Sequence, residues 1–431
     1  CEGKFMSNSV SVLALSLEQK QYVGDFLDCI VGSLDLSETQ YSLIKRAYES
    51  VGAYLAGGDD PILVGAEIYS QGSVRLNTTV KPKGSEQYDV DLLCYLPNAS
   101  VASGWAEVLE AVRARLASHG TYSEMLTPLP RGHRIMYAGE YHLDITPGID
   151  FGYNSSEHSH PLLIPDSRLQ DWKESNPAGY ATWFDNITEK LPIFVRLEVA
   201  SESFIKSAAV RPLPDHTRKK LLNRIVQIFK RHRDVWAAEG GKERIDLKPI
   251  SAIITTLAGQ AYSKICDEGR SYSTDFDVLL DVLELMPDYI RYSYGLYFVP
   301  NPSMPEENFA EKWNVEESRK GEKLRKNFEL WHKTITDNIT EIASSVGEDQ
   351  LLDNLSKYFG ERPVKAVREA MVVGVNAARD SNDLRVLALT GALSAGAANV
   401  PAMARTVPEN TFYGGNALSS APVKKNTFFG D

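Results

Sequence analysis

The chain has 431 residues, of which 43% are hydrophobic and 24% charged, so we expect an ordinary globular protein with two or three packed units. Its net charge of -11 argues against a protein that grips long nucleic acid, because neutralising phosphates needs a basic surface. We find no run of about 18 apolar residues and no basic-then-apolar leader, and we therefore predict a cytoplasmic protein with no membrane partner.

Residues 1–5 precede Met6, and we interpret them as a leader or expression remnant outside the fold. Ser37 followed by Gln40 predicts a capping box for a helix that ends at Gly57-Gly58. The β-rich run from Ile62 to Tyr69 then predicts a strand that leads into a Gly72-Ser73 turn.

The next segments alternate between predicted strands and a helix. A strand from Tyr88 to Leu96 carries the sequence Asp89-Val90-Asp91, and residues 105–118 show the spacing of an amphipathic helix. Two short strands, His133 to Ala138 and Glu140 to Ile145, suit a hairpin around Gly139. Asp144 is a polar residue in an apolar strand, which is typical of a functional carboxylate.

After about Phe151 we expect a loop that reaches Trp183-Phe184 and then a mainly helical second half. The predicted helices are Thr217 to Ala238, Pro249 to Ala261, Thr274 to Leu285, Pro305 to Asp337 and Ile339 to Ser345. We divide the chain into a first lobe at 6–210, a helical lobe at 211–390 and a flexible tail at 391–431. The tail is rich in small and polar residues, which bury too little apolar surface to offset their ordering entropy.

Three carboxylates and a glycine turn together indicate nucleotidyl transfer. On an extended strand Asp89 and Asp91 leave the same face, where they can share a pair of metal ions with Asp144. Carboxylates suit Mg²⁺, which usually completes its shell with phosphate oxygens and water. Backbone N–H groups at Gly72-Ser73 can approach a triphosphate closely. Each signal alone has an ordinary structural reading, as a common turn or a solvated strand end, and Asp150 competes with Asp144.

At this level of detail the chain resembles the cGAS/DncV-like nucleotidyltransferases (CD-NTases), bacterial enzymes that make signalling oligonucleotides in anti-phage systems. The resemblance runs from about Gln71 to Trp313. The matching segments are Gly72-Ser73, Asp89-Val90-Asp91, Asp144, Ile164-Pro165-Asp166 with Trp172, Asn176 to Tyr180, Ile228 to Asp234, Lys248 to Ser251, and Asn301-Pro302 with Glu307 to Phe309 and Trp313.

The resemblance implies a bilobed α/β (α+β) protein with a polymerase-β-like nucleotidyltransferase core, a mixed sheet and a helical second lobe similar to that of oligoadenylate synthase. It implies two Mg²⁺ ions, with Mn²⁺ as the alternative, held by Asp89, Asp91 and Asp144, and an active site in a cleft between the lobes. The residues implied to bind the nucleotide are Gln71, Gly72 and Ser73 for the donor triphosphate, Lys230 and Ser251 for its β and γ phosphates, and Asn301 beside the base.

The expected product is a cyclic di- or trinucleotide made from ATP, GTP or other nucleoside triphosphates, which then binds an effector protein. In some systems of this family a ubiquitin-like conjugation enzyme joins the C-terminus to targets, and the tail would suit that partner. Two alternatives stay open: a template-independent enzyme that extends RNA ends, and a catalytically silent nucleotide-binding scaffold. The basic residues between Arg211 and Arg233 form either a solvated helix face or a triphosphate-facing one.

Overall fold

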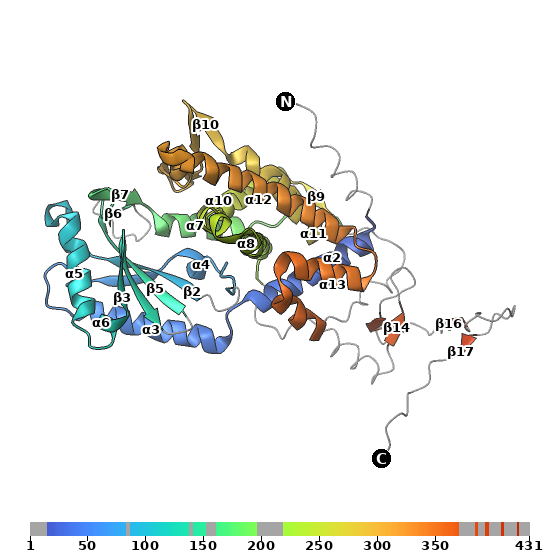
Figure 1. Ribbon diagram of the computed structural model, residues 1–431, viewed down its shortest axis with the longest axis horizontal. Helices are drawn as coiled ribbons and strands as arrows, with labels where there is room; N and C mark the ends of the chain where they lie inside the picture. Colours follow the sequence, from blue (N-terminus) through green and yellow to red (C-terminus); the bar gives the residue numbers. More distant parts are fainter. Residues whose placement is uncertain are drawn as a thin grey trace, which may run out of the picture.

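The computed structural model describes residues 15–82, 87–137, 141–151, 161–195 and 219–369, together with four short strands near the C-terminus. These strands form two antiparallel pairs, β14 (Leu384–Val386) with β15 (Leu393–Ala395) and β16 (Val407–Pro408) with β17 (Ser420–Ala421). Apart from these strands, the predicted tail at 391–431 lies outside the described residues, as does the predicted leader. Figure 1 shows a β-sheet beside a bundle of helices, so the expected α/β class is confirmed.

The sheet is mixed, as predicted. Among the described residues its main path runs β1-β2-β5-β4-β3, and β6 pairs with both β5 and β7. Strands β2 and β5 are parallel neighbours, whereas the other pairs in this sheet are antiparallel. The strands are β1 (Glu67–Ser70), β2 (Tyr88–Tyr95), β3 (Leu126–Leu129), β4 (Gly132–Tyr137), β5 (Tyr141–Asp150), β6 (Leu162–Asp166) and β7 (Asp171–Ser175).

One face of the sheet is covered by helices α3 (Glu38–Ala56) and α5 (Trp105–Ala117), with the short α6 (Tyr122–Met125) beside them. The predicted capping box at Ser37 is present and helix α3 ends before Gly57. Buried apolar residues of both helices form one core with alternate residues of β2 and β5, including Val90 and Leu143. Because side chains alternate along a strand, the residues between these apolar positions lie on the opposite face.

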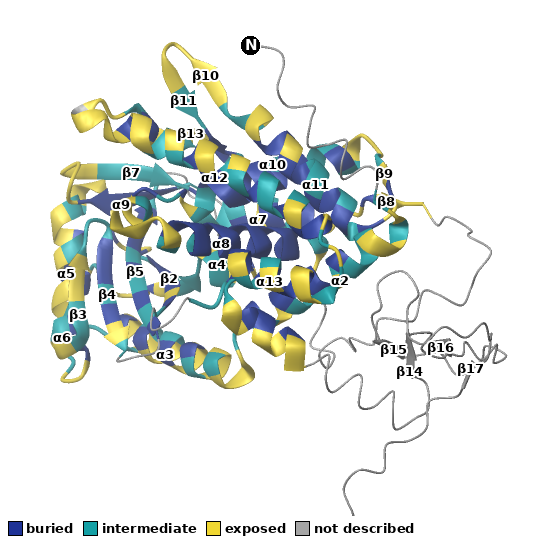
Figure 2. Cartoon of the chain, turned by 45° about the vertical axis from the view of Figure 1, so that its right-hand side comes forward, coloured by how far each residue is buried: buried dark blue, intermediate teal, exposed yellow. Residues whose placement is uncertain are grey.

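A second core lies in the helical bundle, where α8 (Leu221–Glu239) takes the central position and is buried on almost all sides (Figure 2). Helices α2 (Leu17–Leu34) and α7 (Pro177–Thr188) fall within the predicted 6–210 lobe, but their buried residues belong to this second core. Further helices in the described part of the chain are α9 (Gly241–Asp246), α10 (Ser251–Asp267), α11 (Asp275–Leu285), α12 (Lys320–Ala343) and α13 (Glu348–Phe359).

Three predicted segments differ in the structure. The run from Ile62 to Tyr69 is a turn followed by the short β1, because Asp60 accepts the N–H groups of Ile62, Leu63 and Val64 and closes a turn there. The expected loop after Phe151 contains β6, β7 and α7. Helix α7 begins where the Asn176 side chain accepts from the Gly179 N–H and Pro177 takes the first helical position.

The predicted helix from Pro305 to Asp337 is also wrong in its first part. Residues Met304–Asn308 form strand β13, paired with β12 (Pro300–Asn301), and the long helix α12 starts only at Lys320. The Asn308 side chain accepts from the N–H groups of Val299 and Ala310, which stabilises a non-helical backbone at this point. Helix α12 continues through the predicted break at residue 338 to Ala343.

Candidate active site

Two of the three predicted carboxylates, Asp89 and Asp144, meet with His142 on the sheet face opposite the α3 and α5 helices, and Asp91 lies next to this group on β2 without belonging to it. In the parallel pairing of β2 and β5, Asp91 is in register with Asp144, and Asp89 is in register with His142. Ligand atoms of Asp89, His142 and Asp144 lie within 4.8 Å of one another, close enough to hold one metal ion. The structure therefore brings together residues that are separated by more than fifty positions in the chain.

Gly72 lies directly above Asp91. Its φ is +61°, and a Cβ at this position would come within 2.0 Å of Oδ2 of Asp91. The backbone N–H of Gln71 donates to the carbonyl of Asp91 over 2.9 Å, which fixes the turn to strand β2. The four-residue helix α4 (Gly72–Arg75) starts here. Glycine is therefore required at position 72 both for its backbone conformation and for its contact with a carboxylate.

The surroundings of Asp91 disfavour the charged form of its carboxyl group. Burial raises its pKa, and the neighbouring carboxylates Asp89 and Asp144 raise it further, whereas Lys230 and Arg134 lower it. A carboxylate in such surroundings favours either a proton or a bound cation. Asp89 differs from Asp91, because 58% of its side chain is exposed to solvent.

Two residues that the sequence analysis did not single out hold the other carboxylates. Arg134 of β4 donates from Nε to Oδ1 of Asp144 over 2.6 Å and from Nη2 to Oδ2 over 2.7 Å. Nε2 of His142 lies 2.9 Å from Oδ1 of Asp89. The signal for Arg134 was present in the sequence. In a hairpin centred on Gly139, Arg134 and Asp144 are equally distant from the turn and face each other.

Helix α8 fixes the segment that follows the glycine turn. Asn223 donates to the carbonyl of Leu76 over 2.8 Å, and Gln227 donates to that of Thr79 over 2.6 Å. Lys230 donates to the Thr78 hydroxyl over 2.8 Å, and the Thr78 N–H donates to the Ser73 carbonyl over 2.9 Å. Lys230 is thus connected through Thr78 to the predicted phosphate-binding turn.

Lys230 is buried, and its proximity to Asp91 places its ammonium beside the carboxylate face. Burial lowers its pKa to about 7, and nearby Arg233 contributes in the same direction. The reading of this basic stretch as a solvated helix face is wrong for α8, where four cationic side chains are buried: Arg224, Lys230, Arg231 and Arg233. Residues 211–218 lie outside the described residues.

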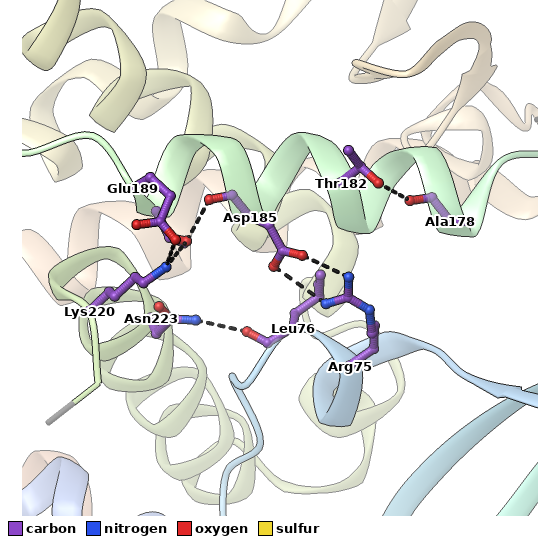
Figure 3. A network of polar contacts seen from close by, with 9 residues as sticks. Arg75, Leu76, Ala178, Thr182, Asp185, Glu189, Lys220 and Asn223 are labelled. Carbon is purple, nitrogen blue, oxygen red and sulfur yellow. Dashed lines mark hydrogen bonds and ion pairs between the residues drawn. The ribbon is translucent and has the colours of Figure 1, made fainter. Parts of the chain in front are cut away.

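A second contact joins the glycine turn to the helical bundle (Figure 3). Arg75, the last residue of α4, forms an ion pair with Asp185 of α7, and its Nη2 lies 2.7 Å from Oδ2. Both side chains are partly exposed. Both attachments lie on the C-terminal side of the turn, where Arg75 binds α7 and the segment directly after it binds α8.

Ser251 and Asn301 lie on other elements. Ser251 is the first residue of α10, and its hydroxyl accepts from Nη1 of Arg233 over 2.9 Å. Asn301 is buried in β12 and donates to Glu307 over 2.7 Å. An open groove of about 730 Å³ lies away from these residues, lined by Lys242, Glu243 and Lys320 among others. Among the described helices, no span has the length and apolar character needed to cross a membrane.

Comparisons with known proteins define the class. Residues 21–187 match the family described as "Second Messenger Oligonucleotide or Dinucleotide Synthetase domain". This range contains the glycine turn and the three carboxylates. The chain is a nucleotidyltransferase that synthesises cyclic oligonucleotide second messengers from nucleoside triphosphates.

Its family follows from whole-chain similarity. The chain is 30% identical to a c-di-GMP synthase of Roseivirga ehrenbergii over 425 residues, which covers 97% of this chain and 100% of the relative. It is 24% identical over 290 residues to the cyclic dinucleotide synthase CdnG of Bradyrhizobium diazoefficiens, with 64% of each chain covered. The chain belongs to the cGAS/DncV-like nucleotidyltransferases, the CD-NTases.

Solved structures support the fold. The GTP complex of the CD-NTase CdnG from Bradyrhizobium diazoefficiens superimposes with a TM-score of 0.59 at 19% identity, covering 80% of this chain and 98% of that one. The ATP complex of CdnC from Escherichia coli MS115-1 gives a TM-score of 0.51 at 13% identity, covering 79% and 98%. The predicted nucleotidyltransferase architecture is thereby confirmed.

Proposed function

We propose that this protein joins two GTP molecules into cyclic di-GMP, with Asp89, Asp91 and Asp144 as the metal-holding residues. The observation that carries the site assignment is the partly buried Asp91, which lies beside two further carboxylates and under the glycine turn. The choice of GTP rests on the whole-length similarity to a c-di-GMP synthase. The CdnG structure with bound GTP is in keeping with that choice.

The residues present fit divalent cations. Their donors are carboxylate oxygens, which Mg²⁺ prefers. The pKa of Asp91 is raised by burial first and then by Asp89 and Asp144, and a bound cation would stabilise its charged form. Asp89, Asp91 and Asp144 would hold two Mg²⁺ ions or, alternatively, Mn²⁺. Bound there, the ions would lower the pKa of the attacking ribose hydroxyl and neutralise the pyrophosphate that leaves.

The chain's own groups position the donor nucleotide in this proposal. The N–H groups of Gly72 and Ser73 bind the triphosphate, and Gln71 positions the turn through the bond from its N–H to the Asp91 carbonyl. Lys230 approaches the triphosphate from α8, beside Thr78. Ser251, held by Arg233, contributes a hydroxyl at the start of α10. Asn301 is buried, so it acts on the base pocket by fixing the conformation of the β12–β13 segment.

The product diffuses to an effector protein in this proposal, and the biological role is anti-phage defence. Conjugation of the C-terminal tail by a ubiquitin-like conjugation enzyme is part of the same hypothesis. The last residues of the tail, 422–431, lie outside the described part of the chain. The net charge of -11 agrees with a nucleotide acceptor rather than an RNA end.

The test is a product analysis. The full chain is incubated with Mg²⁺ and GTP alone, ATP alone or both, treated with phosphatase, and the resistant material is identified by mass spectrometry. We expect a phosphatase-resistant product with the mass of cyclic di-GMP from GTP alone. A resistant product that requires another base would contradict the choice of GTP. Ladders on added RNA would favour the RNA-end enzyme, and no product under Mg²⁺ or Mn²⁺ would favour a silent scaffold.

A further inference from the structure

The ion pair between Arg134 and Asp144 lies inside the proposed metal site. Its two residues face each other across the antiparallel strands β4 and β5. Both oxygens of Asp144 accept an N–H from the same guanidinium, at 2.6 and 2.7 Å. The pair is mostly shielded from solvent, since 30% of the Arg134 side chain and 15% of the Asp144 side chain are exposed. This is a strong bidentate contact and not a loose surface pair.

Arg134 also acts on the rest of the carboxylate cluster. Its partner Asp144 is in register with Asp91 of β2, and the ligand atoms of Asp144 and Asp89 lie within 4.8 Å of each other. A guanidinium cannot give up its proton at physiological pH, so its charge is permanent. Arg134 therefore offsets part of the negative charge to which a divalent cation would bind.

We propose that Arg134 is a built-in counter-charge, which holds Asp144 in place and weakens metal binding until a nucleotide triphosphate arrives. This inference rests on the proposed assignment of Asp89, Asp91 and Asp144 as metal-holding residues. Like charges repel, so a cation entering the free enzyme meets an unfavourable potential from Arg134. A triphosphate adds negative charge and reverses that balance. Each oxygen of Asp144 has a second lone pair, which allows it to bind an ion while it keeps its N–H contact.

Arg134 is thus a positioning residue, because it acts through Asp144. The consequence is that metal and nucleotide bind to the site together, and that the metal binds weakly when the nucleotide is absent. A nucleotide-free enzyme would keep its carboxylates apart from cellular cations, and would still hold Asp144 in the orientation that it needs.

The test measures Mn²⁺ binding to the full chain without nucleotide, by electron paramagnetic resonance of the free ion. Arg134→Met and Arg134→Gln both remove the charge, and Gln retains a hydrogen-bond donor in case the Met variant folds poorly. We expect both to bind Mn²⁺ roughly tenfold more tightly than the unchanged protein. Arg134→Lys keeps the charge and should stay within about threefold of it.

Thermal unfolding gives an independent readout. Without metal, Arg134→Met should unfold at a lower temperature than the unchanged protein, since Asp144 loses its partner. Added Mn²⁺ should then raise the unfolding temperature of this variant by more than it raises that of the unchanged protein. The matched control is Arg113→Met, which removes an arginine that pairs with Glu110 on the exposed surface of α5. Its Mn²⁺ affinity should not change.

Failure of this inference can be separated from failure of the proposed function. If Arg134→Met and Arg134→Gln bind Mn²⁺ no more tightly than the unchanged protein, while Asp91→Asn weakens binding, the metal site stands and the role of Arg134 is overturned. The charge argument is also overturned if Arg134→Lys binds as tightly as the neutral variants. If Asp91→Asn leaves Mn²⁺ binding unchanged, both the metal site and the inference fall.

Discussion

Two helices of this protein, α8 and α12, carry many charged residues, yet they use them in opposite ways. The cationic side chains of α8 are buried in the centre of the molecule, and those of α12 include a set on its solvent face (Figure 2). On α12, Lys326 and Lys333 pair with Glu322 and Asp337, each one turn away on the same helix. On α8, Arg224, Lys230 and Arg231 have partners in distant parts of the chain, whereas Arg233 also pairs with its neighbour Asp234.

The charged residues of α8 and α12 differ in which parts of the protein they connect. Arg224 of α8 binds Asp28 of α2 and Asp275 of α11, and Lys230 binds Thr78 beside the glycine turn. Removing one partner of a buried polar contact lowers the stability of the protein far more than removing one partner of an exposed ion pair between successive turns of a helix. The charged residues of a helix therefore either hold other elements in place or face solvent, depending on what packs against the helix. Substitutions distinguish the two cases.

The largest expected effect on stability is at Arg224. Arg224→Met removes the guanidinium that joins α2 and α11 to α8, and we expect it to lower the free energy of unfolding by about 3 kcal/mol. Urea denaturation measures this difference. The control is Lys326→Met on α12, which should change the free energy by less than about 0.5 kcal/mol. Equal effects of the two substitutions would remove the distinction between the helices.

The next effect concerns activity at Lys230. Lys230→Met removes a buried ammonium beside Asp91 and the glycine turn, so we expect the rate of nucleotidyl transfer to fall roughly 10²-fold. Steady-state kinetics with GTP measures it, and thermal unfolding checks that the variant is folded. Lys326→Met should keep the full rate. A Lys230→Met enzyme that is folded and as active as the control would show that this lysine does not serve the nucleotide.

A smaller effect depends on pH and involves His232, also on α8. Burial lowers the pKa of His232 to about 3 from its ordinary value of 6.5, so the folded protein keeps this imidazole neutral. Below pH 6.5 the unfolded chain takes up a proton that the folded chain does not, and stability falls as the pH falls. His232→Gln should therefore lose about 2 kcal/mol less stability than the unchanged protein between pH 7 and pH 5. Urea denaturation at the two pH values tests this, and identical pH dependence would contradict it.

The smallest effect is expected on the exposed side of α12. Lys333 pairs with Asp337 one turn further along, and 70% of its side chain is exposed to solvent. Lys333→Ala should change the free energy of unfolding by less than about 0.5 kcal/mol, because solvent and salt screen such a pair. A loss of more than about 1 kcal/mol in urea denaturation would show that α12 also uses its surface charges structurally.

The fold was predictable where local signals determine it. The capping residues Ser37 and Gln40 located α3, and the same pattern at Ser16 and Gln19 would have located α2. Prediction failed at β13, where a helix was expected, because the side chain of its last residue Asn308 binds the backbone N–H groups of Val299 and Ala310. Helix α7 was missed although Asn176-Pro177 signals its start locally.

The carboxylates of the site were also predictable, because the spacing of Asp89 and Asp91 on a strand places them on one face. Their partners depend on strand register and tertiary packing. Arg134 reaches Asp144 only through the antiparallel pairing of β4 and β5, and Lys230 reaches the turn only because α8 packs against the segment after it. The buried state of α8 could not be read from a sequence that looks like a charged, amphipathic surface helix.

The central claim is that Asp89, Asp91 and Asp144 hold the metal ions for nucleotidyl transfer. The most direct measurement is the rate of pyrophosphate release from GTP with Mg²⁺ by the Asp89→Asn/Asp91→Asn protein, compared with the unchanged chain. We expect a loss of at least roughly 10³-fold in a protein that is still folded. A rate within about tenfold of the unchanged chain would contradict the claim, because amides cannot replace both carboxylates at such a site.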